Sequence, residues 1–350
     1  MSTIETLLKD LVDKGGSDLH VVQGDYPRAR IAGKIVPLCK IKLDRAFFER
    51  MLQRVMKTDN AVVKLFEKEE IDLTFEVPSV GRFRVNVGLA KGVPFAVFRE
   101  LKTVIPYPHQ LGIPQEFVDV VERIPYGLIF VGGTTGSGKS TTLASVLNYL
   151  LKKQAKKVVT IEDPVEYLIG VENEIAGYVV QREVGRDTKS FASALRAAMR
   201  QDPDYIVVGE VRDVETARYC VIAAETGHTV LTTIHVKDAV SAVGRFVGIF
   251  PTEEQNYLKM RLIDQLEAVQ VQMLVLGKDE KRYLATELLI LNEEVKELFL
   301  KDEVRKVRSL MEKGKCGWLM RQSLEKLLQE GIIDEETFNS YCAFYKTEKI

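Results

Sequence analysis

The chain has 350 residues, 46% of them hydrophobic, which is enough for two domains with sizeable cores. Its 49 Lys and Arg balance its 50 Asp and Glu, so it lacks the basic excess of a typical nucleic-acid-binding protein. No apolar run could span a bilayer, and the four scattered cysteines form no CxxC pair. We expect a cytoplasmic protein with no zinc ribbon, no disulfide framework and no direct nucleic-acid partner.

Residues 1–101 predict a small α+β domain. The segments "DLHVV", "RARIAG", "KIVPL", "IDLTFEV", "GRFRVNVG" and "PFAVFREL" are short and rich in branched or aromatic residues, as strands are. The segment "RAFFERMLQRVMK" predicts a helix, and tight Gly and Pro turns indicate an antiparallel sheet. Residues 102–115 contain Pro106, Pro108 and Pro114, which resist helix and inner strand, so a linker is expected there.

Residues 116–292 predict an α/β domain with a parallel sheet. Here the apolar segments "GLIFV", "KVVTI", "YIVVG" and "TVLTTI" alternate with amphipathic helical segments. Residues 293–350 are charged and predict a C-terminal helical segment.

Within the second domain, "GGTTGSGKSTT" fits the pattern G-x-x-x-x-G-K-[ST] between a strand and a helix. Glycines let backbone N–H groups surround a phosphate, and the helix N-terminus attracts the anion. Lys139 would reach the β- and γ-phosphates of a bound triphosphate, and the Ser140 hydroxyl would bind Mg²⁺. The residues expected to hold the nucleotide are Gly133, Thr135, Gly136, Ser137, Gly138, Lys139, Ser140 and Thr141.

Acidic residues follow two of the predicted strands. Glu210 comes after "YIVVG" and is the candidate general base or water-positioning group. Glu162 and Glu166 lie in "TIEDPVEY" and could serve Mg²⁺ or water. The alternative is that these carboxylates are surface charges or helix caps.

Histidines and arginines complete the candidate set. His228 precedes the strand "TVLTTI" and is expected either to help bind the nucleotide or to satisfy a local hydrogen bond. His235 ends the strand, where a histidine could contact the γ-phosphate or satisfy a local hydrogen bond. Arg82 and Arg99 lie on first-domain strands, and either could neutralise transition-state charge or form a structural ion pair.

Several motifs together resemble the secretion-type traffic ATPases, and most closely the PilT-like retraction motors of type IV pili. The resemblance covers about residues 1 to 290. It rests on "SDLH", "GRFRVN", "TGSGKSTT", "TIEDPVEY", "QREVGRDT", "LRAAMRQDPDYIVVGEVRD" and "AAETGHTVLTTIH".

The resemblance implies a homo-hexameric ring in which each subunit joins a PAS-like domain to a RecA-like P-loop ATPase domain. It implies ATP and Mg²⁺ as cofactors, and an inner-membrane pilus platform protein as partner at the inner face of the cytoplasmic membrane. Glu210 would activate water, and Glu162, Glu166, His228 and His235 would stand in the family's acidic and histidine boxes. Arg82 and Arg99 would close onto phosphate.

One departure bears on the biological role. The "AIR" motif expected of retraction motors reads "EVK" here, Glu294 to Lys296, and lysine lacks the planar fork of arginine. Pilus retraction is therefore weighed against three alternatives. The chain could be an accessory pilus or secretion ATPase, a DNA-uptake ATPase, or a nucleotide-gated assembly factor with little turnover.

Overall fold

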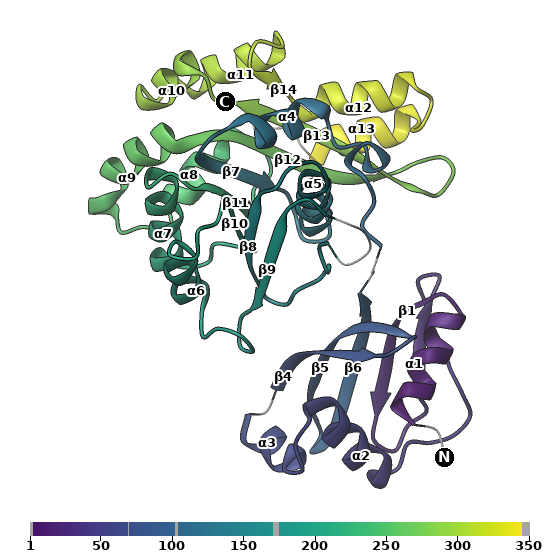
Figure 1. Cartoon of the computed structure of the whole chain (residues 1–350). Helices are drawn as coiled ribbons and strands as arrows, with labels where there is room; N and C mark the ends of the chain where they lie inside the picture. The colour runs from purple at the N-terminus through teal and green to yellow at the C-terminus, as the bar shows by residue number, and fades with distance from the viewer. Residues whose placement is uncertain (1–2, 69, 102–103, 171–174, 345–350) are drawn as a thin grey trace. The chain divides into compact units, whose positions relative to one another are not determined.

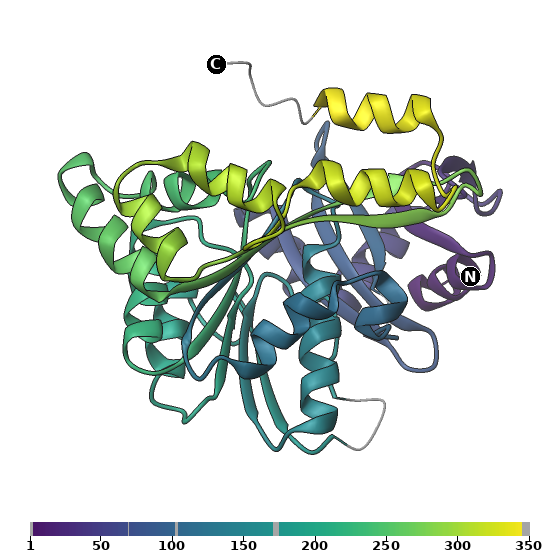
Figure 2. The ribbon, with the colours of Figure 1, turned by 90° about the horizontal axis from the view of Figure 1, so that it is seen from above.

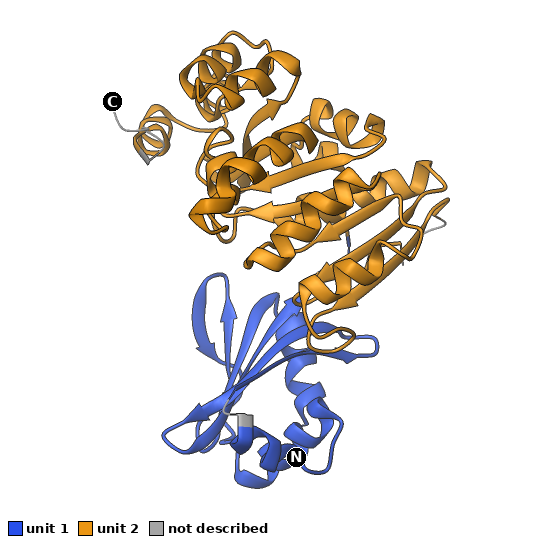
Figure 3. Cartoon of the chain, turned by 90° about the vertical axis from the view of Figure 1, so that its left-hand side faces the viewer, with its two compact units in different colours: residues 1–104 blue, residues 105–350 orange. Residues whose placement is uncertain are grey.

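A computed structural model describes residues 3–68, 70–101, 104–170 and 175–344 (Figure 1). Its contacts divide the chain into two compact units. Unit 1 spans Met1–Val104 and unit 2 spans Ile105–Ile350 (Figure 3). In the described part of the chain no helix has the length and apolar character needed to cross a membrane.

Unit 1 contains a six-stranded antiparallel sheet with the strand order β3-β2-β1-β6-β5-β4. Alternate side chains of its strands pack against the helices, as in the apolar row Phe83, Val85 and Val87. The Asp44 carboxylate starts the second helix by accepting the Phe47 N–H at 2.7 Å. The elements are α1 (Ile4–Asp13), β1 (Gly16–Val22), β2 (Arg28–Ile31), β3 (Lys34–Pro37), α2 (Arg45–Met56), α3 (Ala61–Lys68), β4 (Glu70–Val77), β5 (Gly81–Ala90) and β6 (Val93–Leu101).

Unit 2 is an α/β unit around an eight-stranded sheet with the strand order β14-β13-β12-β7-β11-β10-β8-β9. The strands from β12 to β9 are parallel, and β13 and β14 are antiparallel to their neighbours. The strands are β7 (Gly127–Gly132), β8 (Lys157–Glu162), β9 (Tyr178–Glu183), β10 (Tyr205–Val208), β11 (Thr229–Ile234), β12 (Leu266–Leu276), β13 (Arg282–Ile290) and β14 (Gly317–Trp318).

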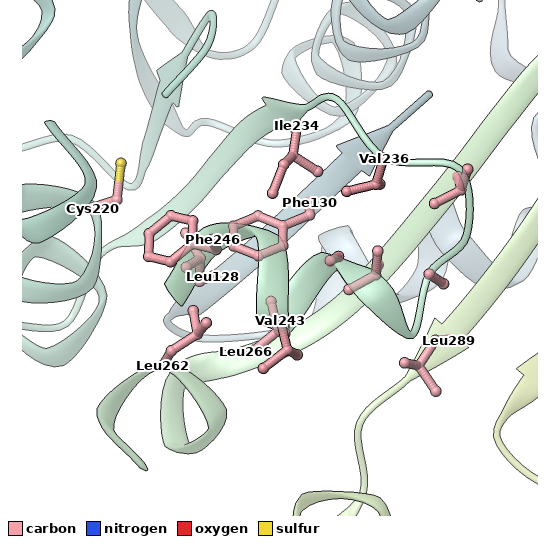
Figure 4. Packing of buried hydrophobic residues seen from close by; sticks show 14 of the residues in the cluster. Leu128, Phe130, Cys220, Ile234, Val236, Val243, Phe246, Leu262, Leu266 and Leu289 are labelled. Atoms are coloured by element: carbon pink, nitrogen blue, oxygen red, sulfur yellow. The ribbon is translucent and has the colours of Figure 1, made fainter. Parts of the chain in front are cut away.

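The helices of unit 2 cover both faces of the central strands. The one-turn helix η1 (Pro108–Leu111), α4 (Gln115–Arg123) and α5 (Lys139–Lys153) lie on one face. The other face is covered by α6 (Phe191–Ala198), α7 (Val214–Glu225), α8 (Ser241–Val247) and α9 (Thr252–Gln265). On that face the rings of Phe130 and Phe246 lie side by side (Figure 4), and they stack with their centroids 5.2 Å apart. The parallel sheet predicted from the sequence is thus confirmed.

The C-terminal helices are α10 (Glu293–Leu300), α11 (Val304–Glu312), α12 (Met320–Gln329) and α13 (Glu335–Phe344). They belong to unit 2, where α12 packs against β13 and α13 packs against α12 (yellow in Figure 2). The last residues, 345–350, lie outside the described ranges. The predicted helical character of this segment is confirmed, with the short strand β14 between α11 and α12.

The expected linker, residues 102–115, differs from what the structure describes. Residues 102 and 103 lie outside the described ranges, and the rest from Ile105 belongs to unit 2. Ile105 and Ile113 are buried against α5, and the Pro106 carbonyl accepts a 2.6 Å bond from the Ser145 hydroxyl. The prolines interrupt regular secondary structure, but the segment still packs against unit 2 because its apolar residues are buried there. The other expected domain boundaries remain predictions.

Candidate functional site

The candidate site is built at the carboxyl edge of the parallel sheet in unit 2. The parallel register aligns Ile234 of β11 with Gly132 of β7, and Val208 of β10 with Ile161 of β8. The residues that follow these strands therefore meet at one edge, where open α/β sheets bind ligands. The structure brings together the phosphate loop (residues 133–140), Glu162, Glu210 and His235.

The phosphate loop needs glycine at specific positions. Gly133 has φ +141°, and a Cβ there would lie 2.5 Å from the Gln272 carbonyl oxygen and 2.5 Å from the Ser137 Oγ. Gly138 caps α5 in the left-handed region with φ +89°. Gly136 also has a positive φ, and with Thr135 it forms the exposed tip of the loop. These positive-φ conformations, which residues with a Cβ rarely adopt, let the loop turn its backbone N–H groups inward.

Two polar side chains of the loop are poised for an anion. The Lys139 Nζ donates to the carbonyl oxygens of Gly133 and Thr134 at 3.0 and 2.9 Å. Burial lowers the pKa of Lys139, and the negative charges of Glu210 and Glu166 act in the opposite direction. The Ser137 hydroxyl is buried and has no hydrogen-bond partner among the described residues. A buried hydroxyl without a partner is costly, so a ligand oxygen would satisfy it.

A buried glutamine braces the loop from the neighbouring strand β12. The Gln272 amide nitrogen donates to the Ser137 carbonyl at 2.8 Å, and its amide oxygen accepts from the Thr142 hydroxyl at 2.9 Å. The same oxygen accepts from Gln270 at 3.3 Å. Sequence reasoning missed this residue. The pattern "VQVQM" was available as a signal, because two glutamines on one face of an apolar strand need buried partners.

Glu210 follows β10 and Gly209. Its carboxylate forms an ion pair with Arg212, and the side chain is only 19% exposed. The Thr233 hydroxyl of β11 donates to the Gly209 carbonyl at 2.6 Å, which fixes the turn before Glu210. The negative charge of Glu210 acts to raise the pKa of both Lys139 and His235. A carboxylate held beside the phosphate loop can orient a water molecule.

Glu162 ends β8 and is tied into a polar network. Its Oε1 accepts from the Thr160 hydroxyl at 2.6 Å and from the Gln181 amide at 3.0 Å. Burial raises the pKa of Glu162, against the effect of these hydrogen bonds, and the charge of Glu166 raises it further. Gln181 also donates to the Tyr167 carbonyl at 2.8 Å, so it joins the acidic segment to β9.

Tyr167 carries this network on to the helix of the phosphate loop. Its hydroxyl lies 3.0 Å from the Thr141 hydroxyl on the first turn of α5. The predicted residue Thr141 therefore contacts the acidic segment, and neither Gln181 nor Tyr167 was predicted. Their contacts join residues far apart in sequence, which no local pattern reveals.

The two histidines lie at opposite ends of β11. His235 follows the strand at the phosphate-loop edge, and its pKa is lowered by burial and by the positive charge of Lys139. His228 precedes the strand, and its Nδ1 lies 3.1 Å from the Ala223 carbonyl. Seven residues of extended chain separate the two by about 20 Å. The strand thus carries His228 to the edge away from the phosphate loop of its own chain, and its role toward a nucleotide stays a prediction.

The predicted arginines belong to unit 1 and share the sheet face that is opposite its helices. Arg99 pairs with the buried carboxylate of Asp18 at 2.7 Å, while its own side chain is 67% exposed. Burial would raise the pKa of Asp18, but hydrogen bonds from Ser17 and Arg99 outweigh burial and lower it. Arg82 is buried at the start of β5. The role of Arg82 and Arg99 toward a nucleotide stays a prediction.

Lys296 stands where the resemblance implies an arginine, and it has a defined structural role. Its Nζ donates to the Asp264 carbonyl at the end of α9 at 2.9 Å and pairs with Glu267 at 3.0 Å. The side chain is 16% exposed. This lysine thus ties α10 to the start of β12.

The described residues contain no group of three His, Cys, Asp or Glu side chains arranged to hold a metal ion. Mg²⁺ that is bound together with nucleotide phosphates needs only one or two oxygen ligands from the protein. Ser140 on the first turn of α5 and Glu162 are the side chains predicted to approach such a cation.

The sequence matches the family described as type II/IV secretion system protein over residues 1–281. It is 37% identical to the type IV pilus retraction ATPase PilT of Pseudomonas aeruginosa, over 95% of this chain and 96% of that protein. It is 39% identical to a twitching motility protein of Neisseria gonorrhoeae, over 91% and 87% of the two chains.

A crystal structure of the pilus retraction motor PilT with bound ADP is similar throughout. The TM-score is 0.90 at 38% identity, with 100% of this chain and 98% of that chain covered. Both the whole-length sequence match and the whole-length structural match support one assignment. This chain therefore belongs to the type II/IV secretion system protein family.

Proposed function

We propose that the chain is an ATP-hydrolysing motor that powers retraction of type IV pili. The observation that carries the ATPase part is the phosphate loop. Its buried Ser137 hydroxyl has no hydrogen-bond partner within the described ranges, and the negative charge of Glu210 acts on its Lys139. The retraction part is supported by the whole-length similarity to PilT and to the twitching motility protein.

In the proposed mechanism, the phosphate loop binds the phosphates of ATP through its backbone N–H groups and the N-terminus of α5. Lys139 leaves the carbonyl oxygens of Gly133 and Thr134 and stabilises the charge that spreads over the terminal phosphate. Glu210 orients the attacking water, and His235 contacts the terminal phosphate group. Mg²⁺, held near Ser140 and Glu162, would neutralise further phosphate charge when bound.

The mechanical part of the proposal extends beyond a single chain. We propose a homo-hexamer in which Arg82 and Arg99 of unit 1 close onto phosphate, with the PAS-like character expected for that unit. The ring would act on an inner-membrane platform protein from the cytoplasmic side. An accessory ATPase of the same apparatus is the second candidate, favoured by Lys296 in place of the expected arginine.

Two variants test the ATPase proposal on the purified chain. Glu210→Gln is expected to retain ATP affinity and to lower turnover about a hundredfold or more, because the water loses its orienting carboxylate. Lys139→Ala is expected to weaken nucleotide binding itself. Turnover near that of the wild type in Glu210→Gln would show that another group positions the water.

Deletion of the gene, followed by counts of surface pili and a twitching assay, tests the biological role. Surplus pili without motility support retraction. Wild-type piliation and motility would favour the accessory role, and loss of pili would indicate extension instead.

A further inference from the structure

A cavity of about 780 Å³ adjoins the phosphate loop on the side away from the acidic residues. Its walls come from the tip of the loop, from the β12–β13 hairpin and from the C-terminal helix α13, all within unit 2. The volume is in the range of small-molecule and cofactor sites. The lining residues used below are Met273, Leu274, Leu276, Arg282, Ser340 and Tyr341.

Strand order fixes which part of a nucleotide this cavity could receive. Glu210, His235 and Glu162 lie at the carboxyl ends of β10, β11 and β8, which are on one side of β7. The cavity lies at β12 and β13, on the other side of β7. A nucleotide with its phosphates on the loop and its terminal phosphate toward Glu210 therefore has its nucleoside end on the cavity side.

The chemistry of the walls suits a nucleoside. Met273, Leu274 and Leu276 supply an apolar surface, and Tyr341 supplies an aromatic ring that can stack on a base. Arg282 is exposed at the start of β13, where its backbone pairs with Leu276, and its side chain makes no hydrogen bond or ion pair among the described residues. At the other end of the cavity, the buried Ser137 hydroxyl has no hydrogen-bond partner in the part of the chain that the structure describes.

We infer that α13 forms a wall of the nucleotide site of its own chain, with Tyr341 against the base and Arg282 near the sugar and the adjoining phosphate. This inference rests on the proposed function, since it takes the phosphate loop to bind a nucleoside di- or triphosphate. The last helix of the chain would then contact the nucleotide directly, so binding would hold α13 against the β12–β13 hairpin.

The test compares the affinities of the full-length chain for ADP and for inorganic tripolyphosphate, measured by calorimetry. Tyr341→Ala is expected to weaken ADP binding about tenfold and to leave tripolyphosphate affinity within twofold, because only ADP carries a base to stack. Tyr341→Phe keeps the ring and should restore ADP affinity. Arg282→Ala, an exposed substitution that spares the fold, should weaken ADP binding about threefold.

Tyr126→Ala is the matched control. Tyr126 is 53% exposed and directly precedes β7, at the sheet edge opposite the phosphate loop, so its removal should change neither affinity. Unchanged ADP affinity in both Tyr341→Ala and Arg282→Ala would overturn the inference and place the nucleoside elsewhere. An equal loss of ADP and tripolyphosphate affinity in Tyr341→Ala would also overturn it, since α13 would then only support the loop. Wild-type chain that bound neither ligand would instead overturn the proposed function, and this inference with it.

Discussion

Gln272 offers the sharpest test of how the phosphate loop is held. Its side chain is fully buried, donates to the Ser137 carbonyl at 2.8 Å and accepts from the Thr142 hydroxyl at 2.9 Å. Gln272→Met keeps the length and the unbranched shape of the side chain but removes both polar ends. Three buried groups then lose a partner, namely the Ser137 carbonyl, the Thr142 hydroxyl and the Gln270 amide nitrogen. At about 1–3 kcal/mol each, we expect the free energy of unfolding to fall by at least about 3 kcal/mol.

Gln270 is a matched control on the same face of the same strand. It donates only the 3.3 Å bond to Gln272, and its amide oxygen has no partner among the described residues. Gln270→Met loses one long hydrogen bond and also removes a buried oxygen that is already unsatisfied. We therefore expect a loss of less than about 1 kcal/mol from this variant.

Urea denaturation followed by tryptophan fluorescence measures both variants. Trp318 is the one tryptophan of the chain and lies in β14 of unit 2, where its ring nitrogen donates to the Thr286 carbonyl at 2.9 Å. The signal thus reports unfolding of the unit that carries the site. Equal losses in the two variants, or no loss in Gln272→Met, would refute the reasoning that Gln272 braces the loop.

Two further predictions concern pH and the histidines. Burial raises the pKa of Glu287 to about 7, although its carboxylate accepts hydrogen bonds from the backbone N–H groups of Ala239 and Met320, which act to lower the pKa. Because the folded chain binds this proton more tightly than the unfolded chain does, Glu287 lowers the free energy of unfolding as pH rises from about 4.5 to about 7, by up to about 3 kcal/mol. Urea denaturation across this range should show a shallower decline for Glu287→Gln, and parallel pH profiles would contradict the assignment. His228→Ala should leave ADP affinity, measured by calorimetry, within twofold of the wild type, because His228 lies at the sheet edge away from the phosphate loop. His235→Ala should lower ATP turnover about tenfold. A loss of ADP affinity in His228→Ala would show that the edge at His228 does reach a nucleotide.

Part of the site could be predicted from the sequence, because it depends on interactions between residues that are close along the chain. The strand "GLIFV", the glycine spacing and the helix after Lys139 are set by backbone sterics and by apolar periodicity, which act over a few residues. The same holds for Glu162, Glu210 and His235, because each lies at or just after the end of an apolar strand, and parallel strands place their carboxyl ends at one edge. The C-terminal helices were likewise readable from their charge and periodicity.

Tertiary structure alone decided the remainder. Gln272 reaches Ser137 across 135 residues, and Tyr341 joins the wall of a cavity that begins at Thr134. His228 and His235 look equivalent in the sequence, yet a six-residue strand places them at opposite edges. These three findings have the same physical reason. The partners of a buried polar group and the walls of a cavity depend on which strands become neighbours in the sheet. That strand order is a property of the whole fold and not of any one segment.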